Sequence, residues 1–166
     1  MAETLGRAHG EGPARTVLSV GRANVPHAIL AAGGMDDADY VDACTVRTDR
    51  ASERTPEEWA RVVLEQTPTG RWAPILWHLL GLRLGPSGSA QYVQGWRIAD
   101  DGDNWIRAET SSWYMTGHAV ALVEGDHLSI ALFLRYDHPI AALIWRPVGA
   151  VHRRALPVMV GQAVRR

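Results

Sequence analysis

The alternation of hydrophobic and polar positions is the clearest feature of the chain, and it is sustained from Ser89 onward. Apolar and polar residues then alternate with a period of two, which is typical of strands with one covered face. The pattern predicts one strand in the first half, at residues 40–48, and four in the second half, at 90–99, 105–113, 114–123 and 128–136. Because short turns separate the four later strands, they should form an antiparallel meander.

Helical spacing predicts two short helices before the meander and a long helix after it. Thr55-Pro56-Glu57-Glu58 combines an N-cap threonine, a first-turn proline and a glutamate three residues on, which is a capping box. A second helix should begin near Trp72 and end before Gly85-Pro86. Residues 139–165 carry a broad apolar stripe, and Pro147 should kink or break that helix.

The length of 166 residues fits a single domain, which we place at residues 39–166. Residues 1–15 are polar and glycine-rich, and we expect a flexible tail there. Residues 16–38 are an ambiguous extension, with a short strand at 16–20 and a short helix at 25–32 as interpretations. A sixth strand beyond the five above would come from residues 16–20 or from a division of residues 105–123.

Composition narrows the classes of function. Apolar residues make up 46% and charged residues 21%, as in a folded globular protein. The net charge is −1, so the chain lacks the overall field that attracts nucleic acid or an anionic membrane. All 17 cationic residues are arginines, and the absence of lysine excludes Schiff-base chemistry and a Walker-type phosphate loop. Lack of lysine with abundant alanine and glycine is typical of high-GC coding, as in actinobacteria.

Motifs for metals, cofactors and membranes are absent from the sequence. Cys44 is the one cysteine, so neither an intrachain disulfide nor a thiolate cluster can form. No HxH or HExxH spacing and no GxGxxG is present, and we expect neither a metal nor a cofactor. Apolar stretches are too short to cross a bilayer, and the first 15 residues lack the apolar core of a signal peptide. The expected location is the cytoplasm.

The order of a strand, two short helices, a meander and a long terminal helix resembles the helix-grip fold of the START-like (SRPBCC) superfamily. This superfamily includes polyketide cyclases and lipid-transfer domains. The segments YVDACTVRT, TPEEWARVV, GWRI and IWRPVGAVHRRALP are similar to a bacterial branch whose members have no settled activity. The resemblance covers residues 39–166 and implies an α+β fold in which a curved antiparallel sheet wraps around the terminal helix. It also implies a cavity beneath that helix for an apolar small molecule.

Eight side chains are candidates for the lining of such a cavity: Tyr92, Trp96, Arg107, Glu109, Trp113, His118, Tyr136 and His152. The chain holds seven tryptophans but one phenylalanine, so the tryptophans either line a cavity or fill the core. His118 is either a general base or a hydrogen-bonded core histidine. His152 either closes the cavity mouth or belongs to a basic helix surface.

Arg107 and Glu109 share one face of the strand at residues 105–113, and that face has two interpretations. If it points into the cavity, the two charges could orient a polar group of a ligand or form a buried pair. If Ile106 and Ala108 point inward instead, the charges face away. The second interpretation is favoured, because it places the apolar side chains of Ile106 and Ala108 inward.

The function most consistent with the sequence is binding of a hydrophobic or lipid-like small molecule between the sheet and the terminal helix. One alternative is a cyclase- or dehydratase-type enzyme that uses His118, Glu109, Tyr92 or Tyr136 as acid–base groups around a pocket. Another is a non-catalytic interaction module whose tryptophans only fill the core. No catalytic residue is assigned. The expected partner is the apolar molecule, and a second copy of the chain stays open as a further partner.

Overall fold

The protein was analysed as a computed structural model that describes residues 15–166. The tail expected at residues 1–15 lies, except for Arg15, outside the described residues. The described chain forms one antiparallel sheet in the order β1-β2-β7-β6-β5-β4-β3. The strands are β1 (Thr16–Val20), β2 (Tyr40–Arg47), β3 (Tyr92–Val93), β4 (Trp96–Gly102), β5 (Trp105–Ser111), β6 (Met115–Glu124) and β7 (His127–Tyr136).

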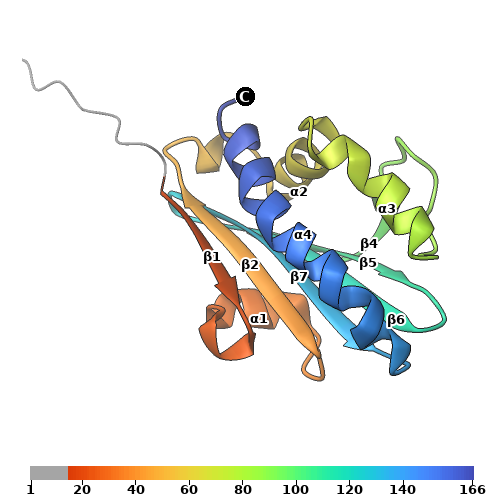
Figure 1. Ribbon diagram of the computed structural model, residues 1–166. Coiled ribbons are helices and arrows are strands. Elements are labelled where there is room, and N and C mark those ends of the chain that lie inside the picture. Colours follow the sequence, from red (N-terminus) through yellow and green to blue (C-terminus); the bar gives the residue numbers. More distant parts are fainter. Residues whose placement is uncertain (1–14) are drawn as a thin grey trace, which may run out of the picture.

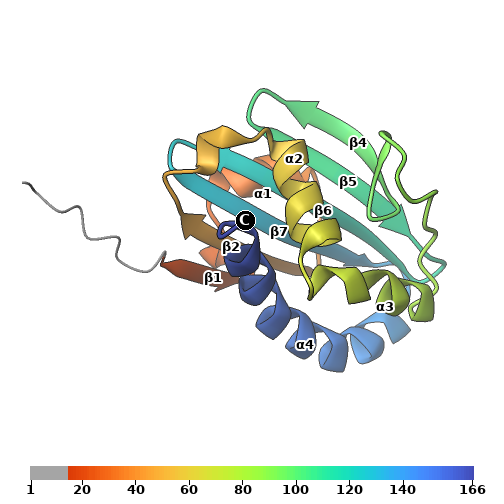
Figure 2. The ribbon, with the colours of Figure 1, turned by 90° about the horizontal axis from the view of Figure 1, so that it is seen from above.

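Helices cover both faces of this sheet. The long C-terminal helix α4 crosses one face, with two short helices beside it, and another short helix lies against the opposite face (Figure 1). The helices are α1 (His27–Gly33), α2 (Pro56–Arg61), α3 (Ala73–Leu79) and α4 (Ile140–Ala163). The curved sheet wrapped around α4 confirms the α+β helix-grip architecture expected from the sequence (Figure 2).

The extension at residues 16–38 contains both elements that its pattern suggested. β1 pairs antiparallel with β2 at the edge of the sheet, with Leu18 opposite Cys44. α1 packs Ile29 and Ala32 against Phe133 on the face that α4 does not cover. This segment therefore adds an edge strand and buries the second face of the sheet.

Two strand boundaries differ from the prediction. The strand expected at residues 90–99 is divided, because Gln94 and Gly95 adopt positive φ angles of 51° and 83° and turn the chain between β3 and β4. β4 then continues to Gly102, so the turn expected from Asp100 onward is shorter than predicted. A register shift between Ile98 and Asp100 accommodates the extra residue.

The start of α2 confirms the capping box. The Glu58 backbone N–H donates to Oγ1 of Thr55 at 3.2 Å, and the Thr55 N–H donates to Oε2 of Glu58 at 2.7 Å. Pro56 occupies the first turn. The two exchanged hydrogen bonds satisfy donors that a helix N-terminus otherwise leaves free.

Of the kink or break expected in α4 at Pro147, the break is absent. Helical structure continues through both Pro147 and Pro157, and Figure 2 shows that α4 bends along its length. A proline inside a helix removes one backbone hydrogen bond and costs roughly 3 kcal/mol. Packing against the sheet offsets this cost, since Trp145 and Leu156 on α4 are almost fully buried.

Candidate functional site

A cavity of about 240 Å³ lies between the sheet and α4. Its floor comes from the central strands, and its other walls come from α3, α4 and the segment before α3. The lining side chains are mainly apolar: Leu64, Thr69, Trp72, Ala73, Leu76, Trp77, Val93, Gln94, Trp96, Ala108, Ala119, Ile130, Ala131, Leu132, Val151, His152, Ala155, Leu156 and Met159. Two of the eight candidates, Trp96 and His152, are among them.

Small residues at the centre of the sheet create the space. Ala108 on β5 lies directly opposite Ala119 on β6, and Ala119 lies opposite Leu132 on β7. Ala119 remains partly exposed although its strand is in the middle of the sheet and beneath α4. The methyl groups of these two neighbouring alanines are short, so they leave space between the sheet and α4. No other described side chain fills this space.

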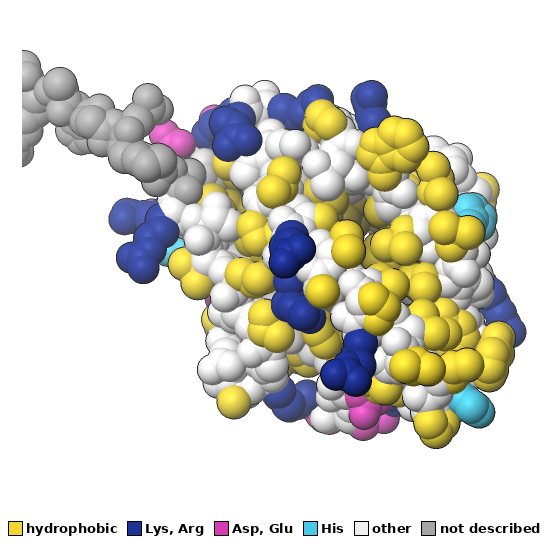
Figure 3. All heavy atoms as spheres, in the orientation of Figure 1, with side chains coloured by type: hydrophobic (Ala, Val, Ile, Leu, Met, Phe, Trp, Pro, Cys, Tyr) yellow, Lys and Arg dark blue, Asp and Glu magenta, His cyan; other side chains and the backbone are white. Residues whose placement is uncertain are grey.

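Apolar side chains surround the mouth of the cavity. Trp72 and Val151 line the cavity, yet they are 72% and 62% exposed. Hydrophobic side chains gather over α3 and the N-terminal part of α4 (Figure 3), and Leu79 and Leu143 are among the exposed ones. The cavity therefore opens to solvent through an apolar rim.

Most polar groups around the cavity already have partners. The Gln94 side-chain amide donates to the carbonyls of Leu64 and Gly70, and its Oε1 accepts from Nε1 of Trp77 at 3.2 Å. Trp96 differs, because its Nε1 is buried and has no hydrogen-bond partner among the described residues. Buried donors without partners are rare in folded proteins.

Among the described lining residues, His152 alone has a titratable side chain, and it contacts a buried acid. Its Nδ1 lies 2.9 Å from Oδ2 of Asp42, whose side chain is completely buried on β2. Tyr40 donates its hydroxyl to the same oxygen at 2.6 Å, and Arg153 donates to the Tyr40 hydroxyl at 3.4 Å. Burial, with the charge of Asp42 adding to it, raises the pKa of Tyr40, which therefore stays a donor.

Asp42 occupies a central position in this side-chain cluster. In the sheet it lies opposite Leu132, in the same transverse row as Ala119 and Ala108. Its second oxygen, Oδ1, is buried and has no partner among residues 15–166. Alternation along residues 40–48 puts Asp42 on the same face of the strand as Cys44. A carboxylate on an otherwise apolar face is the sequence signal that could have identified Asp42.

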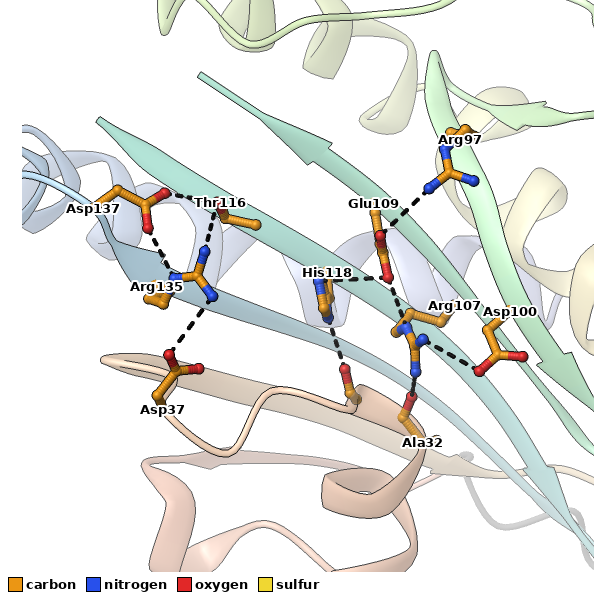
Figure 4. Close-up of polar contacts among 11 residues, drawn as sticks. Ala32, Asp37, Arg97, Asp100, Arg107, Glu109, Thr116, His118, Arg135 and Asp137 are labelled. Carbon is orange, nitrogen blue, oxygen red and sulfur yellow. Dashed lines mark hydrogen bonds and ion pairs between the residues drawn. The ribbon is translucent and has the colours of Figure 1, made fainter. Parts of the chain in front are cut away.

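Three candidates lie on the opposite face of the sheet, beneath α1, and do not line the cavity. Arg107 donates to Oε1 of Glu109 at 3.0 Å, and His118 Nε2 lies 3.5 Å from the same oxygen (Figure 4). The physical reason is strand alternation, because Ala108 between them points to α4. Arg107 and Glu109 therefore face away from the cavity, as in the second of the two interpretations above.

These charges attach α1 to the sheet. Nη1 of Arg107 donates to the carbonyl of Ala32 at 3.3 Å, and Nδ1 of His118 contacts the carbonyl of Gly33 at 2.8 Å (Figure 4). Both carbonyls belong to the C-terminal end of α1, where helix carbonyls lack internal partners. Cationic or donor side chains are favoured at the C-terminal end of a helix. This preference explains why Arg107 and His118 lie beneath α1.

The remaining three candidates also lie outside the cavity. Tyr92 on β3 lines a separate polar groove with Arg97 and Glu109. Trp113 is 67% exposed, and its ring stacks edge-on against Tyr114 and His138. Tyr136, at the end of β7, is partly buried; burial raises the pKa of its hydroxyl, and the charge of Asp39 adds to this effect.

The acid–base set proposed from the sequence therefore does not converge around the cavity. His118 and Glu109 meet each other, but on the α1 face, while Tyr92 and Tyr136 lie elsewhere. Within residues 15–166, no three His, Cys, Asp or Glu side chains are arranged to hold a metal ion. Among the helices of this same part of the chain, none is long and apolar enough to cross a membrane.

Comparison with known proteins adds no relative. No family model, no curated protein and no solved structure matches this chain. The arrangement of the sheet and α4 is compatible with a helix-grip fold, and the functional argument rests on the cavity itself.

Proposed function

We propose that this protein binds a small apolar molecule in the cavity between the sheet and α4. The observation that carries the proposal is the pair of adjacent alanines, Ala108 and Ala119, which leaves an apolar cavity under a helix that is otherwise well packed. Protein interiors are close-packed, and voids larger than a water molecule are few in a domain. A ligand of matching shape would bury the apolar lining and gain its contacts.

The size and the charge of the cavity favour a compact, uncharged ligand. A volume of about 240 Å³ lies below the roughly 300–1,000 Å³ of pockets that hold drug-sized ligands. No arginine, aspartate or glutamate is among the described lining residues. Burial of a ligand's charge there would be costly without a partner of opposite charge. A compact apolar molecule therefore fits better than a two-chain lipid or a phosphorylated compound.

The test is native mass spectrometry of the protein purified from its host, followed by solvent extraction and identification of the bound compound. We expect an apolar molecule close to one per chain. In an Ala119→Leu variant the added side chain would occupy the cavity, and the bound mass should disappear. Ala142→Leu makes the same change on an exposed position of α4 and should leave the bound mass unchanged.

A wild-type protein that carries nothing, and that retains no apolar probe after dialysis, would overturn the proposal. The exposed apolar side chains around the cavity mouth would then favour an interaction module.

The contact between His152 and Asp42 favours a second candidate function, an acid–base enzyme of cyclase or dehydratase type. A histidine held by a buried carboxylate at the wall of an apolar pocket has the arrangement that a general base needs. Incubation of the extracted compound with fresh protein tests this. Loss of one water from the compound, or a change in its chromatographic retention at constant mass, absent with His152→Asn, would support an enzyme. An unchanged mass and an unchanged retention would contradict it.

A further inference from the structure

The side chain of His152 has two ring nitrogens with different environments. Nδ1 is 2.9 Å from the Asp42 carboxylate, and Nε2 makes no hydrogen bond with any of residues 15–166. His152 lines the cavity with its side chain only 11% exposed. The second nitrogen is therefore the polar group that a molecule in the cavity can reach on this wall.

The carboxylate determines what Nε2 can do. Oδ2 of Asp42 already accepts the hydroxyl hydrogen of Tyr40 at 2.6 Å, and it is an acceptor for His152 as well. Nδ1 must then carry the hydrogen, because a carboxylate accepts and does not donate. In a neutral imidazole with hydrogen on Nδ1, the other nitrogen presents a lone pair. Asp42 thus acts as a positioning residue that makes Nε2 an acceptor.

From this geometry we propose that the ligand carries a hydrogen-bond donor, a hydroxyl group on a compact apolar ring system, which donates to Nε2 of His152. This inference rests on the proposed binding function and names the chemical class of the ligand. A carboxylate or phosphate in its place would find no arginine among the described lining residues, and the lone pair on Nε2 of His152 would repel it. A purely apolar molecule would leave Nε2 unpaired and desolvated, which is costly for a buried polar atom.

Trp96 carries a second polar atom near the cavity. Its ring lines the cavity from the floor, and its Nε1 is a buried donor without a partner among the described residues. Gly117 on β6 leaves room for this indole, since a Cβ there would lie 3.0 Å from Cη2 of Trp96. Other protein atoms cover Nε1 of Trp96, and Nε1 of Trp145, which is not among the lining residues, also lacks a partner, so the choice of a hydroxyl rests on Nε2 of His152.

Equilibrium dialysis with three two-ring probes tests the proposal. 2-Naphthol carries a donor, 2-methoxynaphthalene carries the same oxygen without a donor, and naphthalene carries no oxygen. We expect wild-type protein to bind 2-naphthol at least tenfold more tightly than either of the other two. Sites built to bond a hydroxyl reject analogues that lack it.

Variants of His152 and Asp42 separate the role of the acceptor nitrogen from that of the carboxylate that positions it. In His152→Asn the amide can still donate to Asp42, which keeps the buried carboxylate paired, but the Nε2 acceptor is gone. We expect this variant to bind the three probes within about threefold of one another. Asp42→Asn allows either tautomer of His152, and the preference for 2-naphthol should fall without vanishing. His127→Asn, on the exposed β6–β7 hairpin, should behave as wild type.

The outcomes distinguish this inference from the proposed function. If wild-type protein binds all three probes equally, the hydroxyl assignment is wrong while binding of apolar molecules stands. The same conclusion follows if His152→Asn keeps the full preference for 2-naphthol. If wild-type protein carries no compound when purified and binds none of the probes, the proposed function fails, and the inference that rests on it fails too.

Discussion

His152 on α4 and Asp42 on β2 are 110 residues apart in the chain, and their side chains meet at 2.9 Å. This contact joins the terminal helix to β2, the second strand from one edge of the sheet. It also places a paired carboxylate at the edge of an apolar cavity, where an unpaired charge would be costly. The same contact therefore serves the fold and determines the chemistry of the cavity wall.

Removal of one partner should cost more stability than removal of both. His152→Ala leaves the buried Asp42 carboxylate with Tyr40 alone, and we expect a loss of about 3 kcal/mol in the free energy of unfolding. The double variant Asp42→Leu/His152→Leu should recover most of this loss, because apolar side chains often replace a buried pair without penalty. Urea unfolding measures both, and a His152→Ala variant as stable as wild type would contradict the expectation.

The thiol of Cys44 should be inert in the folded protein. It is fully buried, and burial, followed by the charge of Asp42, raises its pKa to about 12. Thiolates are the reactive form, so we expect no labelling by a disulfide reagent at about pH 8 and rapid labelling in concentrated guanidinium chloride. Fast labelling of the native protein would show that this strand opens readily.

The same shift predicts a loss of stability at alkaline pH. Because the folded pKa of Cys44 lies above the unfolded value of 9.0, its contribution is complete below about pH 9 and is lost as the pH rises towards 12. The raised pKa of Tyr40 acts in the same direction at higher pH. Urea midpoints at about pH 7 and 9 should be nearly equal, the midpoint at about pH 11 should be lower, and Cys44→Ala should weaken that decrease.

Local patterns in the sequence predicted the elements well. Alternation over residues 105–136 and the capping box at Thr55 depend on neighbours within a few residues, and both appear in the structure. The boundary between β3 and β4 was missed because it depends on a positive φ at Gln94, a conformation that few side chains other than glycine adopt. Pro147 was expected to kink or break α4; the helix bends along its length but does not break, because tertiary packing offsets the lost hydrogen bond.

The site was harder to predict because alternation defines two faces without saying what covers each. Here α1 covers one face and α4 the other, so polar side chains on either face can be partly buried. Arg107 and His118 belong to the face under α1, and Trp96 to the face under α4. The contact of His152 with Asp42 depends on how α4 lies across β2, which no local pattern contains.

The capping box at the start of α2 gives a stability prediction of its own. Thr55→Ala removes the side-chain acceptor of the Glu58 N–H, and we expect a loss of about 1 kcal/mol. The hydrogen bond from the Thr55 backbone lowers the pKa of Glu58. The carboxylate therefore contributes fully to stability above the usual pKa of a glutamate, and this contribution should be lost as the pH falls below that value. Glu58→Gln retains an acceptor oxygen for the Thr55 N–H, and urea unfolding near neutral pH should show a smaller loss than for Thr55→Ala.

Two glycines in helices should respond in opposite ways to the same substitution. A Cβ at Gly33, the last residue of α1, would overlap the ring of Phe133, which is completely buried beneath it. Overpacking of this kind costs about 1–3 kcal/mol, and Gly33→Ala should reduce stability by that amount. Gly161 on α4 has its nearest atom, Nη1 of Arg165, 3.6 Å from the added carbon. Gly161→Ala should therefore stabilise the protein by roughly 0.5–1 kcal/mol through helix propensity.

Urea unfolding of the two variants, measured beside wild type, checks the packing of α1 as well as its position. If Gly33→Ala were neutral, α1 would have to sit farther from the sheet than its contact with Phe133 requires. Hydrogen exchange would then show fast opening at residues 27–33 already in the wild-type protein. Slow exchange there, lost on Gly33→Ala, is the expected result, because Arg107 and His118 also hold the end of α1.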